Sequence, residues 1–214
     1  MGELTAIDVL LDPDETMLSR AKVVNARMLE SVPSGFALDQ HHRPHITTLQ
    51  RYVRTADLDE LFDAVSGVIE SIDVGSLELT AVELKHMEVA AAPGVGITAI
   101  VVQPSPGVLD FQARLIDAVS PFTESGGTAD AYVRTDAEPE INQDTIDYIE
   151  RYVPDHSGQN YVAHVTVGLA KLDDLEQIEA EPFEALAFSP AGLSVYQLGN
   201  NGTAAKHLKS WTVG

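Results

Sequence analysis

Apolar and polar residues follow two different periods along this chain, and together they predict a mixture of strands and helices. Short β-branched or fully apolar runs are typical of buried strands, whereas apolar positions repeated every three or four residues are typical of helices packed on one face. Strands are expected at 6–11, 45–53, 77–84, 96–102 and 161–170, with two more flanking 200–202. Helices are expected at 12–31, 58–69, 105–119, 146–153 and 171–178.

Proline, glycine and short polar residues mark where these elements begin and end. Asp12-Pro13-Asp14-Glu15 predicts a helix start, with Asp12 as the cap and proline in the first helical position. Pro154 is expected to stop the fourth helix, and 121–139 is expected to be a long loop rich in Gly, Thr and Asp. Asn200-Asn201-Gly202 between two apolar runs indicates a hairpin turn.

The two halves of the chain repeat one order of elements: a helix, a strand that carries a histidine, a second helix and two further strands. This order predicts an internal duplication of about 100 residues, a usual domain length. We therefore expect one domain over 1–214, made of two lobes that correspond roughly to 1–104 and 105–214.

The same short motif occurs on the histidine-bearing strand of each half, as His45-Ile46-Thr47 and His164-Val165-Thr166. Side chains alternate along a strand, so the histidine and threonine of each motif point to one face about 6.6 Å apart. A pseudo-twofold axis between the lobes would bring both motifs to one central cleft. One such motif among seven histidines is a weak signal, but two at equivalent positions are specific.

Two imidazoles and two hydroxyls suit the cleavage of a phosphodiester. In-line displacement needs a base for the incoming oxygen and an acid for the leaving oxygen, and histidine can serve as either near neutral pH. The threonine hydroxyls can donate hydrogen bonds to the non-bridging oxygens, where negative charge accumulates. This chemistry predicts that neither a metal nor another cofactor is needed.

With these two motifs the chain resembles the two-histidine (2H) phosphoesterase superfamily, and within it the bacterial 2′-5′ RNA ligase-like and cyclic phosphodiesterase branch. The resemblance extends from the first strand to the closing hairpin near Trp211. It implies an α+β fold of two pseudo-symmetric lobes, with antiparallel sheets lining a central cleft and helices outside. It implies that His45 and His164 are catalytic and that Thr47 and Thr166 bind phosphate. The implied reaction is hydrolysis of a cyclic phosphate or a 2′-5′ phosphodiester of a small nucleotide or RNA end.

Composition and charge narrow the range of partners. The chain has no cysteine, which removes disulfides, thiolate metal sites and cysteine nucleophiles. Its formal net charge is −20, so we expect a small phosphorylated substrate rather than a long nucleic acid. No apolar run has the length of a membrane span and no signal-peptide pattern occupies 1–11, so neither a membrane nor export is expected and a cytoplasmic location is predicted.

Other activities are compatible with parts of the sequence. A nucleotide-binding protein without turnover would keep the same residues, and RNA 2′-5′ ligase activity would use them for the reverse chemistry. A metal-dependent hydrolase could use His41, His42 and His45, although Pro44 places them in an irregular segment that enforces no ligand spacing.

Three further residues are candidates for substrate contact. Arg43 is a cation close to the first motif, and Tyr161 and Tyr52 could stack on a base. Solvated charge and core packing are the more common roles of such residues.

Overall fold

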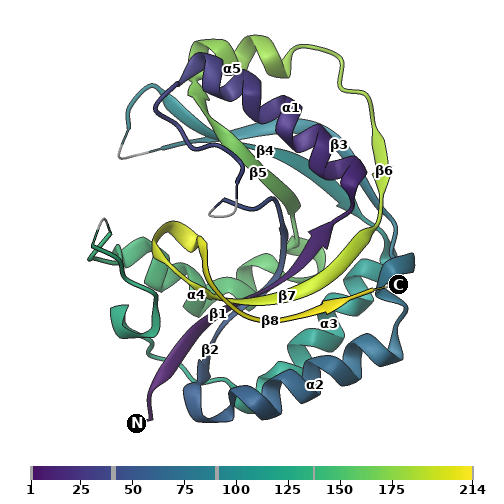
Figure 1. The fold of residues 1–214 in the computed structure, drawn as a ribbon, viewed down its shortest axis with the longest axis vertical. Coiled ribbons are helices and arrows are strands. Elements are labelled where there is room, and N and C mark those ends of the chain that lie inside the picture. Colours follow the sequence, from purple (N-terminus) through teal and green to yellow (C-terminus); the bar gives the residue numbers. More distant parts are fainter. Residues whose placement is uncertain (1, 40–41, 90–91, 137, 214) are drawn as a thin grey trace.

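Two four-stranded antiparallel sheets form the framework of the protein (Figure 1). The computed structural model describes residues 2–39, 42–89, 92–136 and 138–213. The first sheet has the strand order β2-β1-β7-β8, and the second has the order β5-β4-β3-β6. The strands are β1 (Leu4–Pro13), β2 (Ile46–Arg54), β3 (Leu79–Glu88), β4 (Val95–Pro104), β5 (Ala163–Lys171), β6 (Leu186–Phe188), β7 (Pro190–Leu198) and β8 (Ala204–Thr212).

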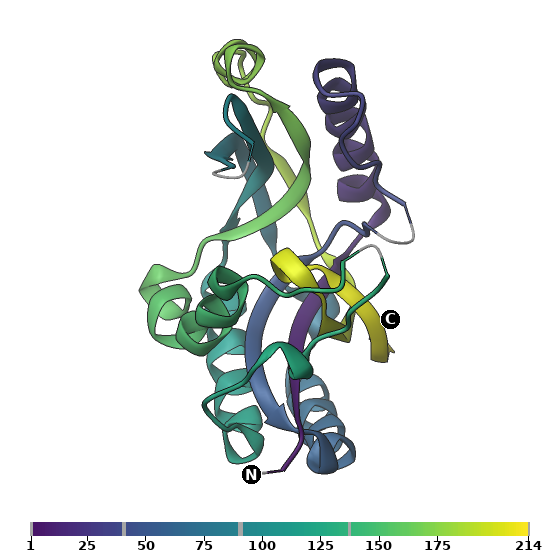
Figure 2. The same cartoon turned by 90° about the vertical axis from the view of Figure 1, so that its left-hand side faces the viewer.

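Five α-helices cover the sheets, and their apolar positions provide much of the core. They are α1 (Glu15–Ser31), α2 (Leu58–Ser71), α3 (Pro106–Val119), α4 (Gln143–His156) and α5 (Leu172–Glu179). Helices α1 and α5 pack against the second sheet, whereas α2 and α3 pack together on the first (Figures 1 and 2). In the described part of the chain no helix is both long and apolar enough to cross a bilayer.

The two lobes are not the two halves of the sequence. Strands β7 and β8 lie in the second half, yet they complete the sheet that β1 and β2 begin. Strands β3 and β4 lie in the first half, yet they pair with β5 and β6. The prediction that the lobes correspond to 1–104 and 105–214 is therefore wrong, because hydrophobic periodicity locates strands without saying which of them pair.

The internal repeat is a strand, a crossing helix and a histidine-bearing strand at the sheet edge. In the first copy, α1 leaves β1, packs against β5 of the other sheet and returns to β2. In the second copy, α3 leaves β4, packs against β2 of the other sheet, and the chain returns to β5 through α4. The crossing helices therefore connect each sheet to the histidine-bearing strand of the other.

Two predicted helix boundaries are wrong for identifiable reasons. Strand β1 continues through Pro13, where the pairing with β7 shifts in register and no amide hydrogen is needed. Helix α1 therefore begins later than expected, and its N-cap is Asp14 rather than Asp12. The Asp14 carboxylate accepts a hydrogen bond of 3.0 Å from the Met17 amide. Helix α4 continues through Pro154 and ends two residues later, so this proline occupies the last turn instead of stopping the helix.

Other elements confirm the sequence-based predictions closely. Helices α2, α3 and α5 begin within one residue of the expected positions. The turn between β7 and β8 places Asn201 at φ 56° and Gly202 at φ 72°, a left-handed conformation that asparagine and glycine adopt most readily.

Candidate active site

The two motif histidines make the same backbone contact. His45 directly precedes β2, and its Nδ1 lies 2.7 Å from the carbonyl oxygen of Arg43. His164 lies on β5, and its Nδ1 lies 2.9 Å from the carbonyl oxygen of Val162. A carbonyl oxygen only accepts hydrogen bonds, so Nδ1 of each ring carries the hydrogen. Each ring therefore keeps Nε2 available to accept or donate a proton.

The structure brings the two motifs together. Strands β2 and β5, from different sheets, lie against each other. The Tyr161 hydroxyl donates a hydrogen bond of 2.9 Å to the carbonyl oxygen of Thr47, which ties a residue close to His164 to the motif of His45. The charge on the Asp8 carboxylate also interacts with both imidazoles. These contacts hold the two motifs in neighbouring positions on the adjoining strands.

The environment of His164 favours the neutral imidazole. The side chain is exposed, but neighbouring protein atoms partly desolvate the ring, and this desolvation is the main cause that lowers the pKa of His164. The hydrogen bond to Val162 acts in the opposite direction, and the charge of a protonated His45 lowers the pKa further. His164 is thus suited to accept a proton at neutral pH.

Asp8 is a fully buried carboxyl in the middle of β1, and sequence analysis overlooked it. Its Oδ2 accepts hydrogen bonds from Thr47 Oγ1 at 2.9 Å and from Gln50 Nε2 at 3.0 Å. Its Oδ1 has no partner among the described residues. Burial raises the pKa of Asp8, whereas the charge of His45 acts to lower it. An acidic residue inside an otherwise apolar strand is the signal that could have identified it.

The protonation state of Asp8 sets the hydrogen-bonding role of Thr47. If Asp8 is ionised, Thr47 donates its single hydroxyl hydrogen to the carboxylate and can only accept from a ligand. If Asp8 is protonated, the carboxylic acid donates to Thr47, whose hydrogen is then free for a phosphate oxygen. Burial raises the pKa of Asp8 and so shifts the balance toward the second arrangement, whereas the hydrogen bond in the structure corresponds to the first, with Thr47 as donor.

Thr166 differs from Thr47 although the motifs match. Its hydroxyl makes no hydrogen bond within the described part of the chain, and the residue opposite it on β4 is Ala99. The Thr166 hydroxyl hydrogen is therefore available to a ligand without help from a carboxyl group. Among the described residues, Thr47 is thus the only one of the two motif threonines whose hydroxyl is hydrogen-bonded to another side chain.

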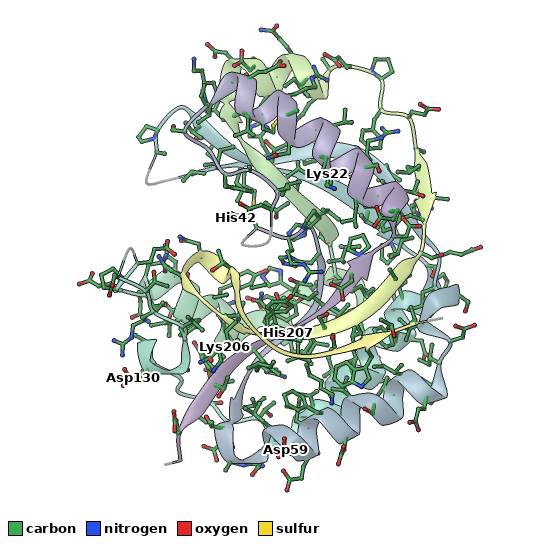
Figure 3. The ribbon with its side chains drawn as sticks, viewed as in Figure 1. Lys22, His42, Asp59, Asp130, Lys206 and His207 are labelled. Atoms are coloured by element: carbon green, nitrogen blue, oxygen red, sulfur yellow. The ribbon has the colours of Figure 1, made fainter. Side chains whose placement is uncertain are left out.

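Arg43 stands beside the site as an exposed cation. Its Nη1 donates a hydrogen bond of 3.2 Å to the Tyr196 hydroxyl, and the Tyr196 ring makes an edge contact with His207, at 5.2 Å between centroids. Tyr196 pairs with Asp8 across the first sheet, which places this group next to the buried carboxyl. Figure 3 labels His207 near the middle of the view, on the exposed edge strand β8.

The Arg43 guanidinium is unusual in this acidic chain because no described carboxylate forms an ion pair with it. Most other arginines do have such partners, namely Arg27, Arg54, Arg114, Arg134 and Arg151. A cation two residues from His45 without a carboxylate partner among the described residues is a feature expected where an anion binds.

The two tyrosines predicted as substrate contacts have structural positions instead. Tyr52 is only 2% exposed, hydrogen-bonds the Tyr132 hydroxyl and packs so closely on Gly127 that no side chain would fit there. Tyr161 is buried, and its hydroxyl is bonded to the Thr47 backbone. Aromatic character alone did not distinguish a binding residue from a core residue.

The predicted metal alternative falls partly outside the described residues, because His41 is not among them. The His42 ring stacks on Phe36 with 4.7 Å between centroids, and its Nδ1 lies 3.7 Å from the Asp39 carboxylate. That alternative stays a prediction.

Comparisons with known proteins give a clear result for the fold. No protein-family model matches the sequence, and no curated protein matches it. The crystal structure of TT0787 from Thermus thermophilus aligns with a TM-score of 0.56 at 10% identity, covering 98% of both chains.

Two further solved structures also align along the whole chain. E. coli LigT complexed with NADP+ has a TM-score of 0.48 at 14% identity and covers 99% of both chains. Usb1 of Kluyveromyces marxianus has a TM-score of 0.43 at 11% identity and covers 99% of this chain and 98% of its own. At such low identities the full-length match to TT0787 establishes the fold, and the expected α+β architecture with two antiparallel sheets is confirmed.

Proposed function

We propose that this protein is a metal-independent phosphodiesterase that hydrolyses a cyclic phosphate or a 2′-5′ phosphodiester of a small nucleotide or RNA end. The observation that carries the proposal is the matched pair of imidazoles. His45 and His164 each have Nδ1 fixed on a backbone carbonyl, Nε2 of each has no hydrogen-bond partner among the described residues, and β2 and β5 adjoin. A protein that only binds a ligand does not need two such prepared acid–base groups.

The two histidines are assigned different roles in the proposed mechanism. Water attacks phosphorus and transfers a proton to Nε2 of His164, whose lowered pKa keeps the ring neutral. His45 enters the step as imidazolium, with hydrogen on both ring nitrogens. The bond from phosphorus to the leaving oxygen breaks, and that oxygen takes the proton from Nε2 of His45, which becomes neutral while His164 becomes the imidazolium. The Thr47 and Thr166 hydroxyls donate to the non-bridging oxygens during this step.

The size and charge of the substrate follow from the surface. A formal net charge of −20 repels a long polyanion, whereas the unpaired guanidinium of Arg43 beside the site supports binding of one small anion. A small nucleotide or a nucleic-acid end fits this balance better than an extended strand.

The proposal is tested with a panel of 2′,3′-cyclic nucleotides and 2′-5′ dinucleotides. His45→Ala and His164→Ala should each lower kcat by about 10² or more with ligand binding largely retained. His86→Gln is the matched control, since His86 is paired with Glu179 and belongs to neither motif. Activity should survive EDTA and follow a bell-shaped pH profile that reports the coupled pair. Calorimetric binding without cleavage of any panel member, or a flat profile between about pH 5 and 9, contradicts the proposal.

A further inference from the structure

Both histidine-bearing strands contain an irregularity at the same place. Along β2 the pairing passes from Leu49 to Thr47, so Thr48 is an extra residue without a partner on β1. Along β5 the pairing passes from Gly168 to Thr166, so Val167 is the extra residue. Each bulge follows the motif histidine by three residues. A bulge of one residue bends its strand and redirects the side chains before it.

One buried side-chain amide binds the carbonyl oxygen of each bulge. On α3, Gln112 Nε2 donates a hydrogen bond of 3.0 Å to the carbonyl oxygen of Thr48. On α1, Asn25 Nδ2 donates a hydrogen bond of 2.8 Å to the carbonyl oxygen of Val167. Gln112 is 1% exposed and Asn25 is 5% exposed. Water cannot easily take the place of either amide, so loss of these hydrogen bonds leaves buried carbonyl groups without a partner.

The same two amides also hold the segment that leads to the opposite histidine. Asn25 Oδ1 accepts from the Leu38 amide at 3.2 Å, and Asn25 Nδ2 donates to the Phe36 carbonyl at 3.0 Å, ahead of His45. Gln112 Oε1 accepts from the Gly158 amide at 3.0 Å, ahead of His164. Each amide therefore joins the bulge after one histidine to the segment before the other.

We infer that Asn25 and Gln112 are a pair of positioning residues that fix the spacing between the imidazoles of His45 and His164. Neither amide touches the reacting atoms in this arrangement. Each acts through backbone groups on both sides of the site, and the two are related by the same internal repeat as the histidines. A displacement of about 1 Å between acid and base costs up to about 10² in rate, so spacing is a property that needs such control.

The rate test uses shape-preserving variants that remove the hydrogen bonds, Asn25→Leu and Gln112→Met. Each should lower kcat at least tenfold in fully folded protein and leave KM within about threefold, because the ligand-binding groups remain. Val65→Ala in α2 is the matched control, since it weakens the core away from both motifs and should leave kcat unchanged. If Gln112→Met does not fold, Gln112→Asn keeps the amide group and shortens its reach. Wild-type kcat in the folded amide variants would overturn the inference.

A second readout does not depend on any substrate. The rate measurement rests on the proposed function, but NMR titration of the His164 ring does not. Replacing His45 by Ala should raise the His164 titration midpoint, because a neighbouring charge is removed. When Gln112→Met or Asn25→Leu is also present, the shift of the His164 midpoint caused by His45→Ala should be clearly smaller, because the distance between the two rings is no longer fixed. An identical response in all backgrounds refutes the positioning role, even if no panel substrate is cleaved.

Discussion

Replacing Gly168 by Ala is the sharpest test of how closely α1 approaches the bulge of β5. Gly168 has a φ of +148°, a conformation that residues with a Cβ atom rarely adopt. An added Cβ would lie 2.8 Å from Met28 Cβ and 3.0 Å from Met28 Cγ. It would also lie 3.2 Å from the Asn25 amide nitrogen. The first of these contacts cannot be relieved by rotating a side chain, so helix and strand must separate.

The expected loss of stability has two parts. A backbone held in a region reserved for glycine costs about 1–3 kcal/mol. Forcing a methyl group into a packed contact costs about 1–3 kcal/mol more. Gly168→Ala should therefore lower the free energy of unfolding by about 4 kcal/mol, a large part of the roughly 5–15 kcal/mol of a typical domain.

Denaturant unfolding followed by the fluorescence of the single tryptophan, Trp211, measures this free energy. Gly67→Ala is the control, because Gly67 lies inside α2 with no atom within 4 Å of an added Cβ. There the change should stabilise the protein by about 0.5–1 kcal/mol. If Gly168→Ala is as stable as the wild type, or if both variants shift in one direction, the described contact between α1 and β5 is wrong.

Three more predictions follow from the site and its supports. Asp8→Asn removes a carboxyl whose pKa is raised by burial, so wild-type stability should fall as pH rises from the ordinary aspartate range through that raised pKa. The melting temperature of the variant relative to that of the wild type should consequently rise as pH increases above about 4, the ordinary aspartate pKa, and a difference independent of pH would count against the buried carboxyl. Arg43→Ala should raise KM for an anionic substrate and weaken its salt dependence with little change in kcat, and Arg43→Lys should restore part of the loss; unchanged KM would exclude a substrate contact. Asn142→Ala removes the side chain that accepts a hydrogen bond of 2.7 Å from the Thr145 amide at the start of α4, and should cost about 1 kcal/mol by thermal denaturation; no measurable cost would mean that this cap is not formed in solution.

The sequence predicts the elements of this fold better than their assembly. Periodicity located the helices and the histidine-bearing strands because each such pattern depends on one local face. It could not assign β7 and β8 to the sheet of β1, because strand pairing joins residues far apart in the chain. Asp14 rather than Asp12 caps α1 for the same reason, since β7 extends the pairing of β1 beyond the local signal.

The part of the candidate site that follows from the alternation of side chains along a strand was predictable. His45, Thr47, His164 and Thr166 stand out because they repeat in equivalent positions. The residues that hydrogen-bond to these motifs differ between the two copies. Asn25 binds the bulge of β5 and Gln112 binds the bulge of β2, and among the described residues only Thr47 is hydrogen-bonded to a carboxyl group. Buried polar contacts of this kind come from tertiary packing, which a single sequence displays only as an unexplained polar residue in an apolar run.

The interleaving of the two sheets has a consequence for synthesis on the ribosome. Strand β1 is made long before its neighbour β7. Until β7 is made, β1 has an open edge, which is prone to pairing with other chains. A chain that ends before Pro190 would still contain both His-x-Thr motifs, yet Asp8 would lack the strand that flanks it and carries Tyr196. A fragment that contains both motifs therefore still lacks part of the candidate site.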